Sequence, residues 1–370
     1  MKRIVLLLLL FIQNISAQEL ALVKNGKKFG YISKSGDFVI QPKYSTAKNF
    51  SDGLAAFELN KKWGFINNKG EVVIPATFED AKYFHNGICL VQKDKKWVYI
   101  NKQGEVQTPP ANDKLYDFEE NIAFFKKDDK IGLINTKMAV VLEPTYEVIK
   151  PFENGYARVK QNNHWGLIDK SGKVVVEIIY DEIGNYFKNV TWAKKGEAFG
   201  LITKGKFVAI EGVDKIWDFT VQDLTYARKN DKIGFIDLNG KWVIEPKFDK
   251  AKAFYKNLAP VYDGKKWGFI DLKGTIVINP VYEDAEIFSA DGLAPIKENK
   301  WGFIDITGKI VIPTQYEITF GGILSIFNGD EKGFVKGLAR VKYGNKSGFL
   351  KTNGEVLGNQ WFENAELFHN

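Results

Sequence analysis

The apolar residues of this chain recur with a constant period. We take as the origin of each copy the first residue of an aromatic-glycine type of pair, as in Trp63-Gly64. Successive origins lie 34 residues apart without exception, at Phe29, Trp63, Trp97, Ile131, Trp165, Phe199, Ile233, Trp267 and Trp301. The tenth origin, Ser347, follows after 46 residues, which places one insertion of twelve residues between about Glu317 and Lys336. The pattern predicts a tandem array of about ten repeats.

Two other columns have the same period. Isoleucine stands three residues after each of the first nine origins, and Leu350 completes the series. Glycine stands seven residues after most origins, and the exceptions are Met138 and Lys206. Repeats four and six are therefore the degenerate ones.

Each repeat is predicted to form β-structure. A short apolar strand such as 63–66 passes through the turn Asn67-Asn-Lys-Gly70 into a second strand, 71–74. Asn or Asp at the start of such a turn bonds the backbone ahead of it, and glycine at its end accepts the left-handed conformation. A strained or altered turn is expected at Met138. Alternation in the second strand indicates that one of its faces is buried.

A proline is predicted to end the second strand, because proline cannot donate a hydrogen bond to a neighbouring strand. An irregular stretch follows, and it carries two regular aromatic positions that we expect to fill the space between neighbouring repeats. A third strand of the type 53–57 then leads into the next repeat. The prolines are Pro42, Pro110, Pro144, Pro246 and Pro280, and the aromatic residues are Tyr44, Phe78, Tyr146, Tyr180, Phe248 and Tyr282, then Phe50, Phe84, Phe118, Phe152, Phe254 and Phe288.

The blocks Trp267-Gly-Phe-Ile-Asp-Leu-Lys-Gly and Trp301-Gly-Phe-Ile-Asp-Ile-Thr-Gly resemble the WG, or KWG, repeat family of bacteria. The resemblance covers nearly all of residues 20–370 and rests on several columns over many copies. It implies an all-β array, but the family has no established common biochemical activity.

We predict an all-β fold in which antiparallel β-meander repeats are stacked on one another, since one repeat cannot bury its own aromatic face. Residues 20–23 match the third strand, and the chain stops just before its last copy of that strand. A closed propeller-like ring and an open twisted solenoid both explain this. We favour the open solenoid, because 34 residues is short for a four-stranded propeller blade, which takes about 40.

The amino terminus has the order of a secretory signal peptide. Lys2 and Arg3 precede the apolar run 4–12, and Ser16 and Ala17 follow it. We predict a signal peptide at residues 1–17 and a single repeat array at 18–370, exported to the periplasm, the cell surface or the medium. No stretch is long enough for a transmembrane helix. The only cysteine, Cys89, has no partner for a disulfide and is expected to be a small core residue.

Lysine directly before the origin is the most regular charged feature. On stacked repeats it would form a ladder of positive charge, a candidate surface for acidic glycans or other polyanions, or else it only keeps the link between strands soluble. Without Lys2 and Arg3 the net charge is +7 − 2 = +5, so nucleic acid is not expected as a partner. The candidate binding lysines are Lys28, Lys62, Lys96, Lys130, Lys232, Lys266, Lys300 and Lys346.

The aromatic columns and the insertion are the other candidates for binding. Tryptophan rings could stack on sugars, but we predict that Trp63, Trp97, Trp165, Trp267 and Trp301 form the core of the repeats. The insertion breaks the pattern once, and insertions in repeat arrays often lie on the binding face. Its candidate binding residues are Phe320, Phe327 and Phe334.

No catalytic or cofactor signature is present. The three histidines, His85, His164 and His369, fall at unrelated repeat positions, so no metal site or catalytic triad is expected. Acidic residues recur after the second strand, but a catalytic pair is needed only once. We therefore expect these acids to support turns and pair neighbouring repeats.

The sequence favours a non-enzymatic exported protein that binds or scaffolds an envelope component, a polysaccharide or another exported protein, with no cofactor. Two alternatives stay open. One is a hydrolase-like or inhibitor-like protein with a single site near the insertion at 317–336, and the other is a structural spacer.

Overall fold

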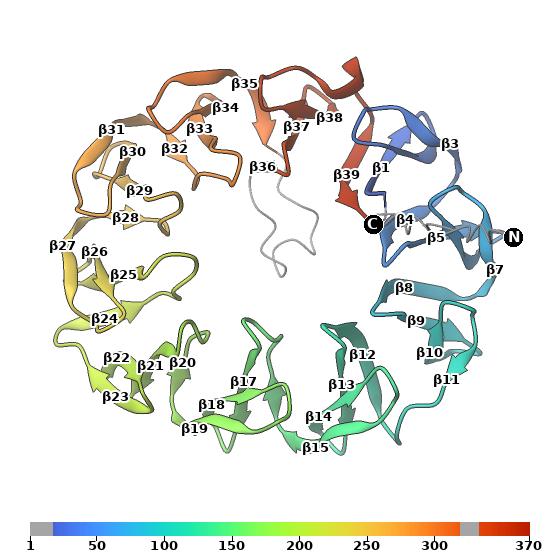
Figure 1. Cartoon of the computed structure of the whole chain (residues 1–370), viewed down its shortest axis with the longest axis horizontal. Helices are drawn as coiled ribbons and strands as arrows, with labels where there is room; N and C mark the ends of the chain where they lie inside the picture. Colours follow the sequence, from blue (N-terminus) through green and yellow to red (C-terminus); the bar gives the residue numbers. More distant parts are fainter. Residues whose placement is uncertain (1–17, 319–332) are drawn as a thin grey trace, which may run out of the picture.

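The chain folds into small antiparallel sheets that follow one another around a ring (Figure 1). The computed structural model describes residues 18–318 and 333–370. Within these ranges there are nine sheets, eight with four strands and one with seven. The seven-stranded sheet serves two repeats, so the sheets account for ten repeat units. In the same ranges, no helix is long and apolar enough to cross a membrane.

Units 1 to 9 each have an inner strand, two middle strands and an outer strand, and in unit 10 the isolated bridges Ser347 to Phe362 and Leu350 to Val356 stand in place of the outer strand. In unit 2 the order is β4 (Ala47–Ser51), β5 (Leu54–Leu59), β6 (Lys62–Asn67) and β7 (Val72–Phe78). Figure 1 places first strands such as β8 and β20 toward the centre of the ring and fourth strands such as β11 and β23 on its outside. The origin residue of each repeat lies on the third strand.

The remaining strands repeat this order. The inner strands of the other units are β8 (Asp80–His85), β12 (Lys114–Glu119), β16 (Val148–Ile149), β20 (Glu182–Ile183), β24 (Val213–Ile216), β28 (Lys250–Ala251), β32 (Asp284–Ala285), β36 (Phe334–Val335) and β39 (Asn364–His369). The second strands are β1 (Leu20–Asn25), β9 (Ile88–Lys93), β13 (Ile122–Lys127), β17 (Tyr156–Gln161), β21 (Val190–Lys195), β25 (Leu224–Lys229), β29 (Ala259–Tyr262), β33 (Ala294–Glu298) and β37 (Leu338–Tyr343).

The third strands are β2 (Lys28–Ile32), β10 (Lys96–Asn101), β14 (Lys130–Asn135), β18 (His164–Asp169), β22 (Ala198–Thr203), β26 (Lys232–Asp237), β30 (Trp267–Ile270), β34 (Lys300–Ile304) and β38 (Lys346–Lys351). The outer strands are β3 (Phe38–Tyr44), β11 (Val106–Gln107), β15 (Val140–Tyr146), β19 (Val174–Tyr180), β23 (Lys206–Ala209), β27 (Trp242–Phe248), β31 (Ile276–Tyr282) and β35 (Ile310–Ile318). A short 3₁₀ helix, η1 (Leu357–Asn359), follows β38.

The two ends of the array meet in one sheet. The last strand, β39, pairs with β1 in antiparallel register, with Ala21 opposite Phe368 and Val23 opposite Ala365. The neighbouring turns are joined as well, since the backbone N–H of Gly26 donates to Glu363 at 2.9 Å. In an open solenoid the first and last units would lie apart. Our preference for that arrangement is therefore wrong for this structure, and the closed alternative fits it (Figure 1).

A four-stranded unit fits within 34 residues because its inner strand, which the sequence did not reveal, is very short. The stretch that we expected to be irregular contains a first strand of only two residues in units such as 5, where it is β16. The link between the second and third strands is equally compact, because Asn60 and Lys61 both adopt positive φ. Short strands and tight links bring a four-stranded unit within 34 residues.

Both faces of each sheet are buried. Phe65 and Ile66 are consecutive residues of β6, so their side chains point to opposite faces, yet they are only 1% and 0% exposed. The same two columns are buried in all ten units. The middle strands of each sheet therefore pack between two neighbours, whereas the outer strand keeps exposed residues such as Val72 and Val73. This is why alternation describes the outer strand and not the middle strands.

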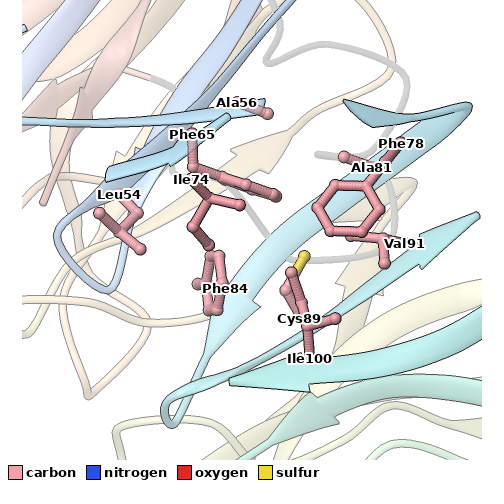
Figure 2. Packing of buried hydrophobic residues seen from close by; sticks show 10 residues of the cluster. All are labelled: Leu54, Ala56, Phe65, Ile74, Phe78, Ala81, Phe84, Cys89, Val91 and Ile100. Atoms are coloured by element: carbon pink, nitrogen blue, oxygen red, sulfur yellow. The ribbon is translucent and has the colours of Figure 1, made fainter. Parts of the chain in front are cut away.

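The interfaces between units are made by the regular aromatic positions. Figure 2 shows one interface, where Phe65, Ile74 and Phe78 of unit 2 meet Phe84 and Cys89 of unit 3. The ring centroids of Phe65 and Phe84 are 4.8 Å apart in an edge-on arrangement, which aromatic pairs prefer. The prediction that these rings fill the space between repeats is confirmed. Cys89 is a buried core residue as predicted, and burial raises the pKa of its thiol.

Proline does not end the second strand of the repeat as predicted. Pro42 and Pro144 lie inside β3 and β15, because these are edge strands in which a missing N–H leaves no neighbour unpaired. Around the proline the outer strand bulges. In unit 2, for example, Trp63 lies opposite Phe78 and Phe65 lies opposite Ile74, so three residues of β7 face the single Gly64.

The glycine after the origin makes this bulge possible. A Cβ on Gly64 would lie 2.6 Å from the carbonyl oxygen of Ile74, and equivalent collisions occur at Gly30, Gly132, Gly166, Gly200, Gly234, Gly268 and Gly302. The outer strand therefore needs a residue without a side chain beneath it. The glycine of the aromatic-glycine pair is thus required because the outer strand packs directly against it.

Met138, which replaces a turn glycine, and the insertion in unit 10 both change the local structure. Met138 adopts φ of 62° and closes the same turn as the glycines it replaces, its backbone N–H donating to Asn135 at 2.9 Å. This confirms the expected strain, because a side chain is disfavoured in the left-handed region. In unit 10, β37 pairs first with Ile318 and then with Phe334. The insertion thus interrupts the inner strand, and residues 319–332, with Phe320 and Phe327, lie outside the described residues.

We predict that Gly64→Ala lowers the free energy of unfolding by about 1–3 kcal/mol, the usual cost of overpacking. The added methyl group collides with the backbone of β7, which cannot rotate away. Urea denaturation of the variant and the wild type measures the difference. Thr77→Ala, an exposed change on the same bulge, is the control. Equal losses for the two variants would contradict the steric role of Gly64.

Candidate functional site

The lysine column lies at the start of the third strand of each unit, beside the link from the second strand. Several of these lysines have an acidic partner in their own unit. Lys130 lies 3.5 Å from Glu147 and Lys62 lies 4.0 Å from Glu79, and Lys232 pairs with Asp249. The ladder is thus interleaved with an acidic column, which weakens its predicted role as a surface for polyanions.

The same acids bind the backbone of the next unit. The backbone N–H groups of Lys95, Asn162 and Gly196 donate to Glu79, Glu147 and Asp181 at 2.8, 3.1 and 2.7 Å. The hydrogen bond from Asn162 holds the pKa of Glu147 below its ordinary value. The prediction that these acids pair neighbouring repeats is confirmed at these positions.

A second acidic column closes the turn before the outer strand. Asp271 accepts the backbone N–H groups of Lys273 and Thr275, each at 2.9 Å, and Asn67 makes the equivalent bonds in unit 2. The bond from Thr275 lowers the pKa of Asp271, and hydroxyl donors from Ser171 and Thr307 do the same for Asp169 and Asp305. These carboxylates are structural turn residues.

The tryptophan column is less buried than predicted. Trp267 is 8% exposed and belongs to the core, while Trp63, Trp165 and Trp301 are half-buried. A lysine on or directly after the inner strand covers two of these rings: Lys48 lies 4.8 Å from the centroid of Trp63, and Lys252 lies 4.9 Å from that of Trp267. Lys252 also donates to the carbonyl of Ala285 in the next unit. These rings are held within the scaffold.

Phe334, a predicted binding residue, is wrongly assigned. Its side chain is 0% exposed, and its ring lies 4.9 Å from that of Phe303 in the neighbouring unit. It occupies the regular aromatic position of the inner strand, displaced by the insertion. No ligand at the surface can reach it.

The segments that follow the inner strands of units 5 to 7 carry polar residues that depart from the pattern. The indole N–H of Trp192 donates to Asp218 at 2.6 Å, and Asn185 donates through its backbone to Asp218 and through its amide to Glu153 at 2.5 Å. Burial raises the pKa of Glu153. These groups bond to one another across three units, so they act as ties within the ring.

The histidines are dispersed over different sheets, in β8, β18 and β39. Among residues 18–318 and 333–370 no group of three or more histidine, cysteine or acidic side chains is arranged to hold a metal ion.

Unit 3 lacks most of its outer strand, and unit 10, whose outer side is held by isolated bridges, is the other irregular unit among the described residues. In unit 3 the outer strand β11 consists of Val106 and Gln107 only, where other units have up to nine residues. The segment continues as Thr108-Pro109-Pro110, and two successive prolines remove two backbone donors and disfavour any continuation of the ladder. The chain returns to a sheet at Lys114, in unit 4.

The origin of unit 3 is therefore without an outer neighbour. In seven units the origin residue lies opposite a Tyr or Phe of the outer strand, for example Trp63 opposite Phe78 and Trp165 opposite Tyr180. In unit 10 Ser347 bridges Phe362, and in unit 6 the backbone N–H of Ile210 donates to Phe199. Trp97 pairs only with Gln92 on the inner side, since β11 reaches no further than Tyr99.

The residue after this origin changes accordingly. Nine of the ten origins are followed by glycine, and Trp97 is followed by Val98. Without a bulging outer strand above it, this position has room for a side chain. The replacement of glycine by Val98 and the shortening of the outer strand therefore go together, because the glycine is needed only where the outer strand bulges over it.

The uncovered edge of β10 has an aromatic and basic character. Trp97 is 37% exposed, the most open tryptophan of the origin column. The ammonium of Lys82 lies 5.3 Å from its ring centroid. Lys95 and Lys96 are exposed beside it. Asp113, the acid of this column, accepts the backbone N–H of Asp128 at 2.8 Å, as Glu79 accepts that of Lys95. We take Trp97, Val98, Lys82 and Lys96 on this edge as the candidate site, called the unit 3 edge below.

The sequence contains a signal for this site, but it consists of departures from the repeat pattern, whereas our predictions rested on the positions that recur in every repeat. Val98 in place of glycine, Pro109-Pro110 in place of one proline, and Asn112 in place of the outer aromatic residue all fall in unit 3. Each change taken singly is an ordinary loss from a repeat. Only the structure shows that all three concern the same edge.

We predict that the turn carboxylates make the stability of the array depend on pH. Their lowered pKa values mean that their contribution is present above the ordinary Asp pKa of 3.8 and is lost as the pH falls below it. The triple variant Asp169→Asn, Asp271→Asn, Asp305→Asn keeps the acceptor, as Asn67 does naturally. Its thermal midpoint should fall less between pH 7 and pH 3 than that of the wild type. An unchanged pH dependence would contradict this role.

Comparisons with known proteins agree with the repeat architecture. The family model described as "WG containing repeat" matches residues 29–63, 63–97, 99–130, 131–164, 165–197, 233–267, 267–300 and 301–319. Unit 6, one of the two degenerate repeats, is not matched. No curated protein matches this sequence.

Solved structures match this chain at low sequence identity. A structure titled "Crystal structure of the eukaryotic initiation factor" is 10% identical, covers 95% of this chain and 98% of its own, and has a TM-score of 0.52. The extracellular domain of a hybrid two-component system protein from B. thetaiotaomicron is 11% identical over 93% of this chain and 56% of its own, with a TM-score of 0.29. PorZ of Porphyromonas gingivalis, described as a surface component of the type-IX secretion system, is 10% identical over 95% and 59%, with a TM-score of 0.25.

Proposed function

The chain belongs to the family of WG-containing repeat proteins, and we propose that it is an exported, non-enzymatic scaffold that binds a partner protein through the unit 3 edge. The exported location rests on the predicted signal peptide at residues 1–17. Of the ligands that the sequence left open, namely an envelope component, a polysaccharide or another exported protein, we select a protein.

The observation that carries the proposal is the missing outer strand of unit 3. Trp97 is 37% exposed and has no ladder partner on its outer side, while every other origin has a partner on that side. Lys96 and Val98 pair with β9, and Tyr99 pairs with β11, so the backbone N–H and C=O groups of Trp97 are the ones left without a strand partner at this edge. A polypeptide is a ligand that can supply the hydrogen bonds they lack.

The other surfaces support a protein ligand over a polysaccharide. The lysine column is partly neutralised by acids, as in Lys130 with Glu147. Lysines cover the rings of Trp63 and Trp267, which leaves little open aromatic face for a sugar. The carboxylates of both acidic columns accept backbone N–H groups, a structural task that every copy requires.

We expect purified residues 18–370 to sediment with a protein-containing outer-surface fraction at roughly physiological salt, where surface charge attraction is largely screened. Treating that fraction with protease before mixing should abolish the binding. Isolated envelope polysaccharide and peptidoglycan serve as parallel samples. Binding to either polysaccharide, or binding that survives the protease treatment, would contradict a protein partner. The absence of binding to any fraction would favour a structural spacer.

A further inference from the structure

Lys82 of the unit 3 edge has equivalents in two other units. Each of these lysines stands fifteen residues before the origin of its unit, and its ammonium lies over the ring of that tryptophan. The pairs are Lys48 with Trp63, Lys82 with Trp97, and Lys252 with Trp267. The contacts of the other two lysines therefore show what Lys82 lacks.

The other two lysines are neutralised by the next unit. Lys252 lies 3.4 Å from Asp284, and Lys48 lies 3.8 Å from Asp80. Each lysine also donates to the backbone carbonyl of the residue that follows this aspartate. Their side chains are accordingly only 26% and 23% exposed. In both places the aspartate comes 32 residues after the lysine.

In unit 4 a lysine takes the position of this aspartate. Lys114 stands 32 residues after Lys82, and β12 pairs with β13 in the same register as β8 with β9. Both lysines are exposed, and the ammonium of Lys114 lies 4.7 Å from the ring centroid of Tyr116. Within the described part of the chain, neither side chain forms an ion pair or a hydrogen bond. Two positive charges therefore stand where units 2 and 8 make an ion pair with the next unit.

The acids around these two lysines do not neutralise them. Asp113 accepts a backbone N–H at 2.8 Å. Asp117 of β12 is near enough for the charge of Lys82 to oppose the rise that burial causes in its pKa, but the two side chains form no ion pair. Lys96 is exposed beside them. The site thus keeps an excess of positive charge, which favours an anionic ligand.

The surroundings of Trp97 favour a carboxylate carried by a polypeptide. The ammonium of Lys82 lies 5.3 Å from the ring centroid, so one face of the ring is covered and is not open for stacking on a sugar. The backbone N–H and C=O groups of Trp97 have no strand partner. A loop of a protein can supply a peptide group and acidic side chains together, and a single residue needs no added strand.

On the basis of the proposed function, we propose that the unit 3 edge, together with Lys114, is a docking site for an acidic loop of the partner protein. One carboxylate of the loop binds between Lys82 and Lys114 and neutralises both, and a second carboxylate pairs with Lys96. An apolar side chain of the loop packs against the exposed part of Trp97. Charge-assisted hydrogen bonds of this kind are strong, and matched charges exclude partners of the wrong sign.

The probe is a capped peptide with the sequence of residues 281–285, Val-Tyr-Glu-Asp-Ala, which contains the ring beside Trp267 and the aspartate beside Lys252. It carries an uncharged dye for fluorescence anisotropy. We expect saturable binding to purified residues 18–370 at about 0.05 M salt, and weaker binding at about 0.15 M because of screening. The amide form, Val-Tyr-Gln-Asn-Ala, should bind about tenfold more weakly.

The decisive variant is Lys114→Asp, which gives Lys82 the partner that Asp80 and Asp284 provide elsewhere. Its thermal midpoint should be at or above that of the wild type, and its affinity for the peptide should fall about tenfold. Lys82→Ala should weaken binding to a similar extent. Lys241→Asp is the matched control, because it makes the same change of net charge at an exposed position of unit 7 where unit 1 carries an aspartate. It should leave binding unchanged.

Equal binding of the peptide to the wild type and to Lys114→Asp would overturn the proposal, as would its failure to bind a folded wild type. A trisaccharide of galacturonic acid that binds as tightly as the peptide would overturn the choice of a protein loop. These outcomes are distinct from failure of the proposed function. If the surface fraction sediments Lys114→Asp as well as the wild type, in a protease-sensitive manner, the chain binds a protein at another place. If no fraction sediments either form, the proposed function itself fails.

Discussion

Burial of both faces of every sheet is the constraint on which this molecule depends. Residues such as Phe65 and Ile66 point in opposite directions from one strand, and each is covered by a different neighbouring unit. A unit at a free end would leave one such face in water. At about 25 cal/mol per Å² of apolar surface, exposing a face of several large side chains costs several kcal/mol. The pairing of β39 with β1 removes both ends at once, which gives the closed ring an energetic reason.

The polar columns of the repeat follow from the same packing. Tight stacking requires short links, and short links leave backbone N–H groups that need acceptors. The acids after the outer strand, such as Glu79 and Asp181, accept those groups from the next unit, and the turn residues such as Asp271 accept them within the unit. The charged residues that recur in every repeat thus have a structural role. Function is more reasonably sought where regularity stops, and the unit 3 edge is the place where an origin has lost its outer neighbour.

Much of the fold could be predicted from the sequence, because the repeat is specified by local chemistry. Turn residues, apolar columns and aromatic positions each had one structural role in every copy, and the structure confirms the hairpins and the aromatic packing between units. The inner strand was missed since it is as short as the two residues of β16 and is bulged in β4. Ring closure was misjudged for the same reason, because repeat length was compared with longer blades. Trp97 was assigned to the core because the sequence did not show that the outer strand of its repeat, β11, is too short to reach it.

The pairing of the two ends tests the account most directly. Lys24 of β1 lies opposite Asn364 of β39, and neighbouring residues on paired strands have Cα atoms within the range that a disulfide spans. The variant Lys24→Cys, Asn364→Cys should form an intramolecular disulfide under mild oxidation, seen as a mobility shift that reductant reverses. The pair Lys24→Cys, Asn162→Cys, whose second position lies in unit 5, should not. Rapid and complete crosslinking of the first pair alone is the result that a closed ring predicts, while equal failure of both pairs would contradict it.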